Sequence, residues 1–287
     1  MIENVTIIGT GLIGASVALA LRRAGFAGDI HGWDASFPAL DAAYRCGADL
    51  IPCGNTPSAV NPPYPGVVVL AGPVLSILDW MEKLAPVCGE GVLITDVGST
   101  KLDIANAAER LFNKPGTARF LPGHPMAGKE SGGAALAEAS LFDGATWLFT
   151  PVAEETVLEA EWRGWVAKFG ARTMDLEAAR HDQICAWVSH LPQMVATAMS
   201  AMFEDEFAAQ PELAADFRAI GGRALREMTR LGASPYSMWR DVAFTNTQPL
   251  AATLFALEQR LTHLRENLKT PELREEFEKA NAFRRER

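Results

Sequence analysis

The loop from Pro122 to Gly128 holds a histidine, His124, in a position that the sequence predicts to be rigid. Two prolines and two glycines define this loop, so His124 does not lie on the apolar face of a helix. A general base needs such positioning, because it must stay within hydrogen-bond reach of the proton it accepts. We therefore expect His124 to act as a catalytic base or polarising group, rather than as a structural loop histidine.

A second loop whose side chains could take part in catalysis covers residues 96–101, Asp-Val-Gly-Ser-Thr-Lys, and follows an apolar run. It puts the hydroxyl of Ser99 and the ammonium of Lys101 at a strand-to-helix turn. We take Ser99 as a candidate catalytic residue and Lys101 as a candidate substrate ligand. Ser99 could instead be a plain helix N-cap, and one hydroxyl could do both.

A glycine pattern near residue 10 is typical of a dinucleotide-binding turn. Gly9 permits the tight turn, Gly11 lets the backbone approach a pyrophosphate, and Gly14 allows close helix–strand packing. The helix that begins at about Leu12 and Ile13 offers unpaired N–H groups to the phosphates. These residues are the expected cofactor site.

Two further features bear on the cofactor. Asp34 lies about 20 residues beyond the last glycine, where a carboxylate binds the ribose 2′-hydroxyl, and the next four residues contain no Arg or Lys for a 2′-phosphate. NAD is therefore favoured over NADP, although Asp34 could be a helix N-cap, a role that Ser36 would serve equally well. The small residues Ala71, Gly72 and Pro73 let a flat nicotinamide ring approach the backbone.

Two histidines further along the chain fall in one helical pattern. His181 and Asp182 open it, and His190 lies just before Pro192, which breaks the hydrogen-bond ladder. Such a break often lines a site, which makes His190 a candidate substrate ligand. Equally, His181 could cap the helix and His190 could belong to a buried network.

A basic stripe comes later in the chain. Arg223, Glu227 and Arg230 recur at i, i+4 and i+7 and so share one helix face. One interpretation is a solvated ion-pair stripe. The other is that one arginine clamps a substrate carboxylate in bidentate fashion. An acidic substrate needs such a local cluster, because the net charge of −9 provides no general attraction for anions.

Apolar runs alternate with helical patterns over the first 174 residues. The runs fall at 5–8, 67–71 and 92–97, and the helical patterns at 12–24, 74–85 and 101–112. This alternation predicts an α/β domain, a doubly wound parallel sheet of the Rossmann type. Residues 175–287 show only long helical patterns, at 178–203, 211–231, 238–268 and 271–284, and predict an all-helical second domain for substrate binding and dimerisation.

Composition excludes several classes of function. The chain has 287 residues, 48% of them hydrophobic, and its negative charge argues against a nucleic-acid partner. No apolar stretch is long enough to cross a membrane. The four cysteines lack zinc-ligand spacing, so we expect no metal site and a cytoplasmic location with reduced thiols.

Several short motifs follow one another along most of the chain. They are Gly9-x-Gly-Leu-Ile-Gly-x-Ser16, Asp96-Val-Gly-Ser-x-Lys101, Gly123-His-Pro-Met-Ala-Gly128, His181-Asp182, Ser189-His-Leu-Pro192, Thr229-Arg-Leu231 and Met238-Trp-Arg-Asp241 with Asn246. In this order and spacing the chain resembles the prephenate and arogenate dehydrogenase family of tyrosine biosynthesis. The resemblance implies a nucleotide domain followed by a helical dimerisation domain, and hence a homodimer. Helical segments that are apolar on several faces fit this, although a large helical core within one chain would also explain them.

The resemblance also implies a reaction, the oxidative decarboxylation of prephenate or arogenate. Hydride leaves C4 of the cyclohexadienyl ring for NAD, and loss of CO₂ makes an aromatic product without help from a metal. In this family pattern His124 would bind the 4-hydroxyl, Ser99 would help to position it, and Arg230 would hold a carboxylate.

One position departs from the family pattern. Gln193 stands where many prephenate-using members have a second histidine, and an amide tolerates either a keto or an amino side chain. Glu227 would favour the ammonium of arogenate if it faced the site, but it could simply pair with Arg223 or Arg230. The choice between prephenate and arogenate therefore stays open.

Two alternatives belong to other classes. A β-hydroxyacid or 6-phosphogluconate-like dehydrogenase relies on a lysine in its helical domain, and residues 176–268 contain none. A non-catalytic NAD-sensing protein would be marked by loss of the strand-end histidine, and His124 is present.

Overall fold

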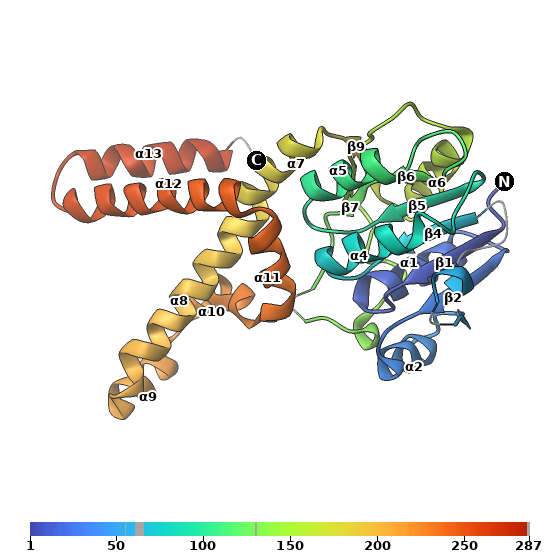
Figure 1. Ribbon diagram of the computed structural model, residues 1–287. Helices are drawn as coiled ribbons and strands as arrows, with labels where there is room; N and C mark the ends of the chain where they lie inside the picture. The colour runs from blue at the N-terminus through green and yellow to red at the C-terminus, as the bar shows by residue number, and fades with distance from the viewer. Residues whose placement is uncertain (55, 61–65, 130, 286–287) are drawn as a thin grey trace.

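The computed structural model describes residues 1–54, 56–60, 66–129 and 131–285. Strands alternate with helices as far as Asp175, and the described residues after it form helices only (Figure 1). Six parallel strands form the main sheet, in the order β3-β2-β1-β4-β5-β6. They are β1 (Asn4–Ile8), β2 (Asp29–Trp33), β3 (Ile51–Pro52), β4 (Gly66–Leu70), β5 (Val92–Asp96) and β6 (Arg119–Leu121).

A smaller sheet of three strands lies beside the main one. In it β7 pairs with β8 in antiparallel fashion and β8 pairs with β9 in parallel. These strands are β7 (Gly123–Pro125), β8 (Thr146–Phe149) and β9 (Arg172–Asp175). The helices of this part are α1 (Leu12–Arg23), α2 (Phe37–Arg45), α3 (Pro57–Val60), α4 (Val74–Leu84), α5 (Leu102–Leu111), α6 (Val157–Lys168) and the short 3₁₀ turn η1 (Ala134–Leu136).

The order of the main sheet reverses at β1, which pairs with β2 on one side and β4 on the other. Their register aligns Ile8 with Trp33 and with Leu70, and Leu70 in turn with Asp96. The carboxyl ends of these four strands are therefore level along one edge. In doubly wound sheets, ligands bind outside this edge at the point of reversal. The expected doubly wound α/β fold is confirmed.

The central strands β1, β4 and β5 are covered on both faces of the main sheet, which explains their largely apolar sequences. Successive residues of β4 point to opposite faces, as strand geometry requires. Val67 and Val69 belong to a core that also contains α1 and Trp147, whereas Val68 and Leu70 belong to a second core under α4 and α5.

The helical part extends away from the sheet in two directions, along α8 and along the pair α12–α13 (Figure 1). Its elements are α7 (Ala178–Cys185), η2 (Ala186–His190), α8 (Leu191–Ala208), α9 (Pro211–Ile220), α10 (Arg223–Thr229), η3 (Arg230–Ala233), α11 (Tyr236–Thr245), α12 (Thr247–Glu266) and α13 (Glu272–Arg285). Two helical patterns that the sequence predicts as continuous are divided, one at Gly221 and Gly222 and the other at Asn246.

The helix broken by Pro192 is not simply kinked. Residues Ala186–His190 widen into a π-helical turn, η2, before α8 continues with Pro192 in its first turn. A proline clashes with the carbonyl four residues earlier and cannot donate to it. The wider turn accommodates this mismatch, and π turns of this kind are frequent at functional sites.

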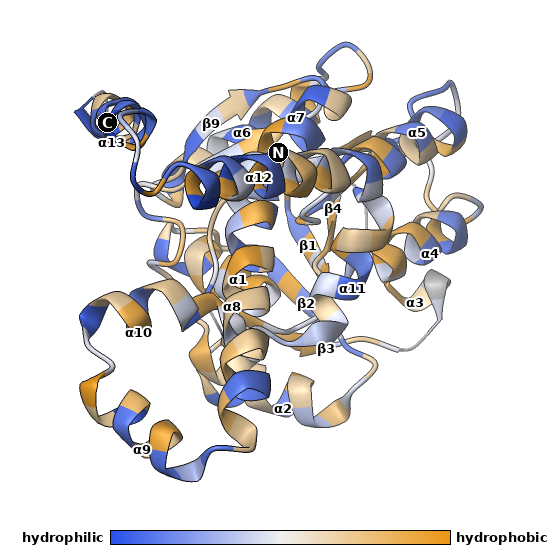
Figure 2. Ribbon diagram, turned by 90° about the vertical axis from the view of Figure 1, so that its left-hand side faces the viewer, coloured by the Kyte–Doolittle hydropathy of each residue, from blue (hydrophilic) through white to orange (hydrophobic). Residues whose placement is uncertain are grey.

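The helical part buries little of its own apolar surface. Both clusters of core hydrophobic residues lie wholly before residue 172. Large side chains of α11 and α12 are exposed, with Phe244 at 71% and Phe255 at 62%, and apolar segments run along α8 (Figure 2). The alternative of a large helical core within one chain is therefore wrong for the described residues. Among them, no helix combines the length and apolar character that a membrane crossing needs.

Candidate active site

The glycine-rich turn after β1 has the geometry that its sequence predicts. Gly9 has a φ of +95°, and a Cβ there would lie 2.7 Å from the carbonyl oxygen of Ala71. A Cβ on Gly14 would lie 2.0 Å from the carbonyl oxygen of Gly9, so α1 packs directly on this turn. Gly11, by contrast, has no atom within 4 Å of its Cβ position, which leaves room for a ligand.

A cavity of about 230 Å³ opens at this turn, at the carboxyl ends of β1, β2 and β4. Six of the expected cofactor residues line it: Gly9, Gly11, Asp34, Ala71, Gly72 and Pro73. Leu12 and Ile13 do not line the cavity. Leu12 is buried at the start of α1 and Ile13 packs on the core, so these two positions can offer only their backbone N–H groups.

Asp34 connects the two loops at the edge of this cavity. Its carboxylate accepts hydrogen bonds from the backbone N–H groups of Thr10, at 2.8 Å, and Ser36, at 2.8 Å. The N-cap of α2 is Ser36, so the alternative role of Asp34 as that N-cap is wrong. None of the residues lining the cavity is Arg or Lys. A dinucleotide without a 2′-phosphate fits this lining, because a 2′-phosphate would face a carboxylate with no cation beside it.

Next along the same edge, a buried ion pair organises the candidate catalytic loops. Asp96, at the end of β5, accepts hydrogen bonds from the N–H groups of Gly98 at 2.7 Å and Gly123 at 3.1 Å, and from Lys101 Nζ at 2.6 Å. Burial raises the pKa of Asp96, and the nearby Lys101 ammonium opposes that rise. Lys101 is fully buried and its ammonium is held by Asp96, so it joins two loops of the site. Its expected contact with the substrate stays a prediction.

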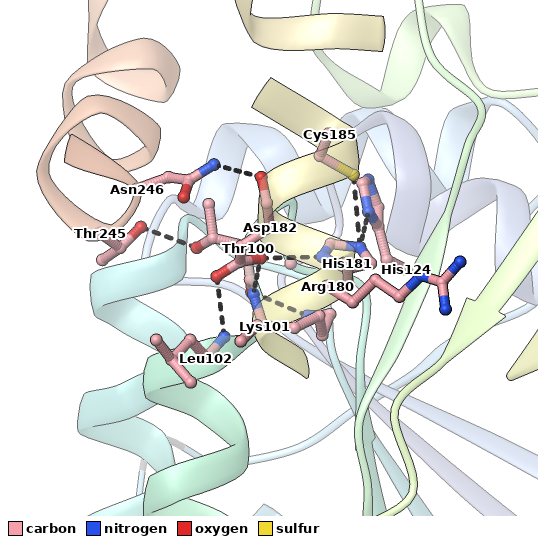
Figure 3. A network of polar contacts seen from close by, with 12 residues as sticks. Thr100, Lys101, Leu102, His124, Arg180, His181, Asp182, Cys185, Thr245 and Asn246 are labelled. Carbon is pink, nitrogen blue, oxygen red and sulfur yellow. Dashed lines mark hydrogen bonds and ion pairs between the residues drawn. The ribbon is translucent and has the colours of Figure 1, made fainter. Parts of the chain in front are cut away.

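Asp182 connects the helical part to the nucleotide part. One of its oxygens accepts from the N–H of Lys101 at 2.7 Å and the other from the N–H of Leu102 at 2.9 Å, which caps α5 from α7 (Figure 3). The N-cap position of α5 is Lys101, so the alternative that Ser99 caps this helix is wrong. Within the described part of the chain, no hydrogen bond occupies the Ser99 hydroxyl, which is half-buried.

The two histidines of the site form a chain with Asp182. His181 Nδ1 lies 2.8 Å from Asp182 Oδ1, and His181 Nε2 lies 2.9 Å from His124 Nδ1 (Figure 3). A carboxylate only accepts, so Nδ1 of His181 carries the proton and its Nε2 has a lone pair. His124 Nδ1 must then donate to that lone pair. This leaves the lone pair of His124 on Nε2, the atom that can accept a substrate proton.

Burial keeps this histidine pair neutral. The pKa of His124 is lowered well below its usual value, first by burial and then by the proximity of His181, Lys101 and His190. Burial also lowers the pKa of His181, although Asp182 opposes this. At neutral pH both rings are therefore uncharged, and His124 is ready to accept a proton.

His190 sits in the π-helical turn and is also buried. Asn246 Nδ2 lies 3.0 Å from its Nδ1 and donates as well to the carbonyl oxygen of Asp182. Because Asn246 donates to Nδ1, the proton of His190 is on Nε2. That Nε2 atom is buried without a hydrogen-bond partner among the described residues, as is Nε1 of the neighbouring Trp239. Burial lowers the pKa of His190 to about 4.

The remaining candidate residues lie on α8, α10 and η3. Gln193 is buried, and its amide donates to the carbonyl oxygen of Leu231 at 2.8 Å and accepts from Ser234 at 3.1 Å. Glu227 is exposed and pairs with Arg223 at 2.6 Å, as one interpretation of the stripe predicted. Arg230 begins the η3 turn that Gln193 holds against α8.

Two residues that organise the site were given no role in the sequence interpretation. Asp96 and Asn246 were part of recognised motifs, but only the structure shows that they fix the loops and His190. The signal available for Asp96 was its place at the carboxyl end of a buried strand. Asn246 gave no such signal, since its partners are 56 and 64 residues away in sequence.

A glycine-lined cleft at the reversal point of a parallel sheet, beside a buried neutral histidine, defines the class of two-domain nucleotide-dependent dehydrogenases. Residues 17–174 match the model of the prephenate dehydrogenase nucleotide-binding domain, and residues 177–281 match that of the prephenate dehydrogenase dimerization domain. The chain belongs to the prephenate dehydrogenase family.

Individual relatives agree with this assignment. The chain is 31% identical to a prephenate dehydrogenase of Lactococcus lactis, over 92% of this chain and 70% of that protein. The fold matches a crystal structure of A. aeolicus prephenate dehydrogenase in complex with hydroxyphenyl propionate and NAD⁺, with a TM-score of 0.86, 27% identity, and coverage of 100% and 98%. Synechocystis arogenate dehydrogenase is also similar, with a TM-score of 0.75, 28% identity, and 99% coverage of both chains.

Proposed function

We propose that this chain catalyses the NAD-dependent oxidative decarboxylation of prephenate, arogenate or both, with His124 as the base. The observation that carries the residue assignment is the chain from Asp182 through His181 to His124, which leaves a lone pair on His124 Nε2. Family membership sets aside the hydroxyacid dehydrogenase and NAD-sensing alternatives.

The cofactor site is the cavity beside Gly11. NAD⁺, when bound, supplies the hydride acceptor. The open space at Gly11 admits a pyrophosphate, and the uncapped N-terminus of α1 provides N–H donors for it. Asp34 binds the ribose hydroxyls, and Ala71 and Gly72 form the surface for the nicotinamide ring.

The protein's chemical task is to accept one proton and hold the substrate in place. His124 Nε2 accepts the proton of the ring hydroxyl as C4 loses hydride, and Ser99 positions that hydroxyl with its own free hydroxyl group. The positive charge that develops on His124 is stabilised through His181 by Asp182. Loss of CO₂ then makes the ring aromatic, which renders the step irreversible.

Two groups are proposed to hold the substrate's acidic ends. His190 Nε2 is a buried donor that lacks a partner in the described chain, and an unpaired buried donor is costly unless a ligand satisfies it. Arg230 offers the bidentate geometry that a carboxylate prefers. Lys101 becomes a positioning residue. Gln193 and Glu227 have partners within the chain, so neither is assigned a contact with the substrate side chain.

The assembly is proposed from the exposed apolar surface of the helical part. We propose that residues 1–174 form the nucleotide domain and residues 175–287 the helical domain, and that two copies associate through the latter. The exposed side chains Phe244, Phe255 and Leu261 support this, because a stable free surface rarely carries so many. A cytoplasmic location stays a prediction.

The test is to measure initial rates of nucleotide reduction with prephenate and arogenate side by side, each with NAD and NADP. We expect turnover with at least one substrate and NAD as the better cofactor. Absence of turnover with both substrates, in a preparation that binds NAD, would overturn the proposal. The ratio of the kcat/KM values identifies the preferred substrate.

A further inference from the structure

Three donor atoms from two distant segments of the sequence converge at the proposed base, His124. His124 lies on β7, and His181 and Cys185 lie one turn apart on the same face of α7 (Figure 3). His181 Nε2 is 2.9 Å from His124 Nδ1 and 3.5 Å from Cys185 Sγ, and the three atoms all lie within 4.8 Å of one another. All three residues are buried, with exposures of 8%, 0% and 1% for His124, His181 and Cys185.

We propose that His124, His181 and Cys185 form a binding site for Zn²⁺, or a divalent ion of similar chemistry, whose occupation switches off the base. Two imidazoles and one thiolate are the ligands such an ion prefers, and three protein ligands leave a fourth position for water or substrate. Zn–N bonds of about 2.0–2.1 Å place two ligand nitrogens of a tetrahedral site about 3.3 Å apart. The two histidine atoms therefore need to separate by only a few tenths of an ångström.

The surroundings of His181 match those of a metal ligand. Histidines that bind metals donate their other ring N–H to a carboxylate or carbonyl, which fixes the ring and raises its basicity. His181 Nδ1 donates to Asp182, and Asp182 is held in turn by two backbone N–H groups of α5. This structure therefore already contains the hydrogen bonds that hold a zinc-binding histidine in place.

Binding of the ion changes the protonation of the base. In the metal-free site His181 Nε2 has a lone pair, His124 Nδ1 carries a proton, and the buried Cys185 is a thiol. On binding, the proton of His124 moves from Nδ1 to Nε2 by way of solvent, and the Cys185 proton is released. One proton leaves per ion bound. His124 Nε2 then has no lone pair, so it cannot accept the substrate proton; this consequence rests on the proposed function.

The binding arm of the test uses Co²⁺ as a spectroscopic probe and needs no substrate. Co²⁺ bound to a thiolate produces a charge-transfer absorption in the near ultraviolet. We expect this band in the parent protein and in Cys88→Ala, which removes another buried thiol whose pKa is about 12. We expect it to disappear in Cys185→Ala and in Cys185→Ser, two variants that guard against a folding failure of either. Absence of the band in the parent, or its persistence in both Cys185 variants, would overturn the site.

The kinetic arm adds Zn²⁺ to the dehydrogenase assay in a buffer free of thiols and phosphate. We expect inhibition that EDTA reverses, that Mg²⁺ does not reproduce, and that is at least about tenfold weaker in Cys185→Ala relative to that variant's own uninhibited rate. Equal inhibition of both Cys185 variants and the parent would overturn the proposal. A Cys185-dependent Co²⁺ band without inhibition by Zn²⁺ would support the site but overturn the inference that its occupation switches off the base.

Discussion

His124 Nδ1 lies 2.9 Å from His181 Nε2, and this one contact determines which nitrogen of His124 is basic. Asp182, at the other end of this hydrogen-bond chain, determines which ring nitrogens of the two histidines carry protons. Replacing His124 with Asn keeps a polar side chain but removes the base. We expect kcat to fall about 10²–10⁴-fold while NAD affinity, measured by fluorescence titration, changes little. Near-normal turnover in this variant would show that His124 is not the catalytic base.

Asp182→Asn tests the control of the tautomer. An amide whose NH₂ group takes the place of Oδ1 can donate to His181 Nδ1, which reverses the hydrogen-bond chain and places a proton on His124 Nε2; the same change removes the acceptor for the Lys101 N–H. We expect kcat to fall by about 10²–10⁴-fold, the scale seen when a base is held in the wrong tautomer. Asp103→Asn, on the first turn of the same capped helix, is the control and should stay close to the parent. A normal kcat in Asp182→Asn would mean that the chain does not set the tautomer.

The buried histidines predict how stability responds to acid. The pKa of His190 falls to about 4 in the folded chain from an ordinary value of 6.5, so the unfolded chain binds more protons between these values. Stability is therefore fully present above pH 6.5 and is lost as the pH falls toward 4, by at most about 1.4 kcal/mol per pH unit for each such histidine. Urea unfolding at pH 7.5 and pH 5.0 measures this loss. His190→Asn should reduce this pH dependence of the unfolding free energy, and an unchanged dependence in the variant would contradict the prediction.

Asp34→Asn tests the choice of cofactor. The amide can still accept from the Thr10 N–H, but it no longer repels a 2′-phosphate. We expect the preference for NAD over NADP, measured as the ratio of kcat/KM values, to fall at least about tenfold, or ~1.4 kcal/mol. Asp41→Asn, which changes an exposed charge on α2, should leave the ratio unaltered. An unchanged ratio in Asp34→Asn would show that another residue discriminates between NAD and NADP.

Gln193→Leu distinguishes a substrate contact from a structural one. Leucine cannot bind the carbonyl of Leu231 or the hydroxyl of Ser234, so the η3 turn that carries Arg230 should loosen. We expect KM to rise by the same factor for prephenate and arogenate, and Arg230→Ala to abolish most of that effect in the double variant. A change in the ratio between the two substrates would show instead that Gln193 contacts the side chain in which they differ.

The nucleotide half of the site was predictable because its signals are local. Gly9, Gly11 and Gly14 lie within one turn and the following helix, and backbone geometry alone requires glycine at two of them. The alternation of strands and helices likewise fixes the edge at which the loops meet. Each of these inferences depends on residues close together in the sequence.

The catalytic half was only partly predictable, because its contacts join distant segments. His124 could be singled out by its stiff loop, but its partner His181 lies 57 residues away. Lys101 was expected at the substrate, yet a carboxylate five residues earlier holds it in the interior. Gln193 was expected to face the substrate, and its hydrogen bonds go to Leu231 and Ser234 instead. Sequence patterns show which side chains can form hydrogen bonds, but not which partners they contact in the folded chain.

The capping of α5 by Asp182 links reactivity to the mutual placement of the two domains. Asp182 belongs to the helical part, while Lys101 and Leu102 belong to the nucleotide part, so its carboxylate spans the junction. Thr100 and Thr245 make a second contact across it, at 2.7 Å. Any hinge motion that opened the junction would pull His181 and Asp182, which lie together on α7, away from α5 and from His124 on β7. His181 can therefore fix the tautomer of His124 only while the two domains are closed, so the proposed mechanism requires closure before proton transfer.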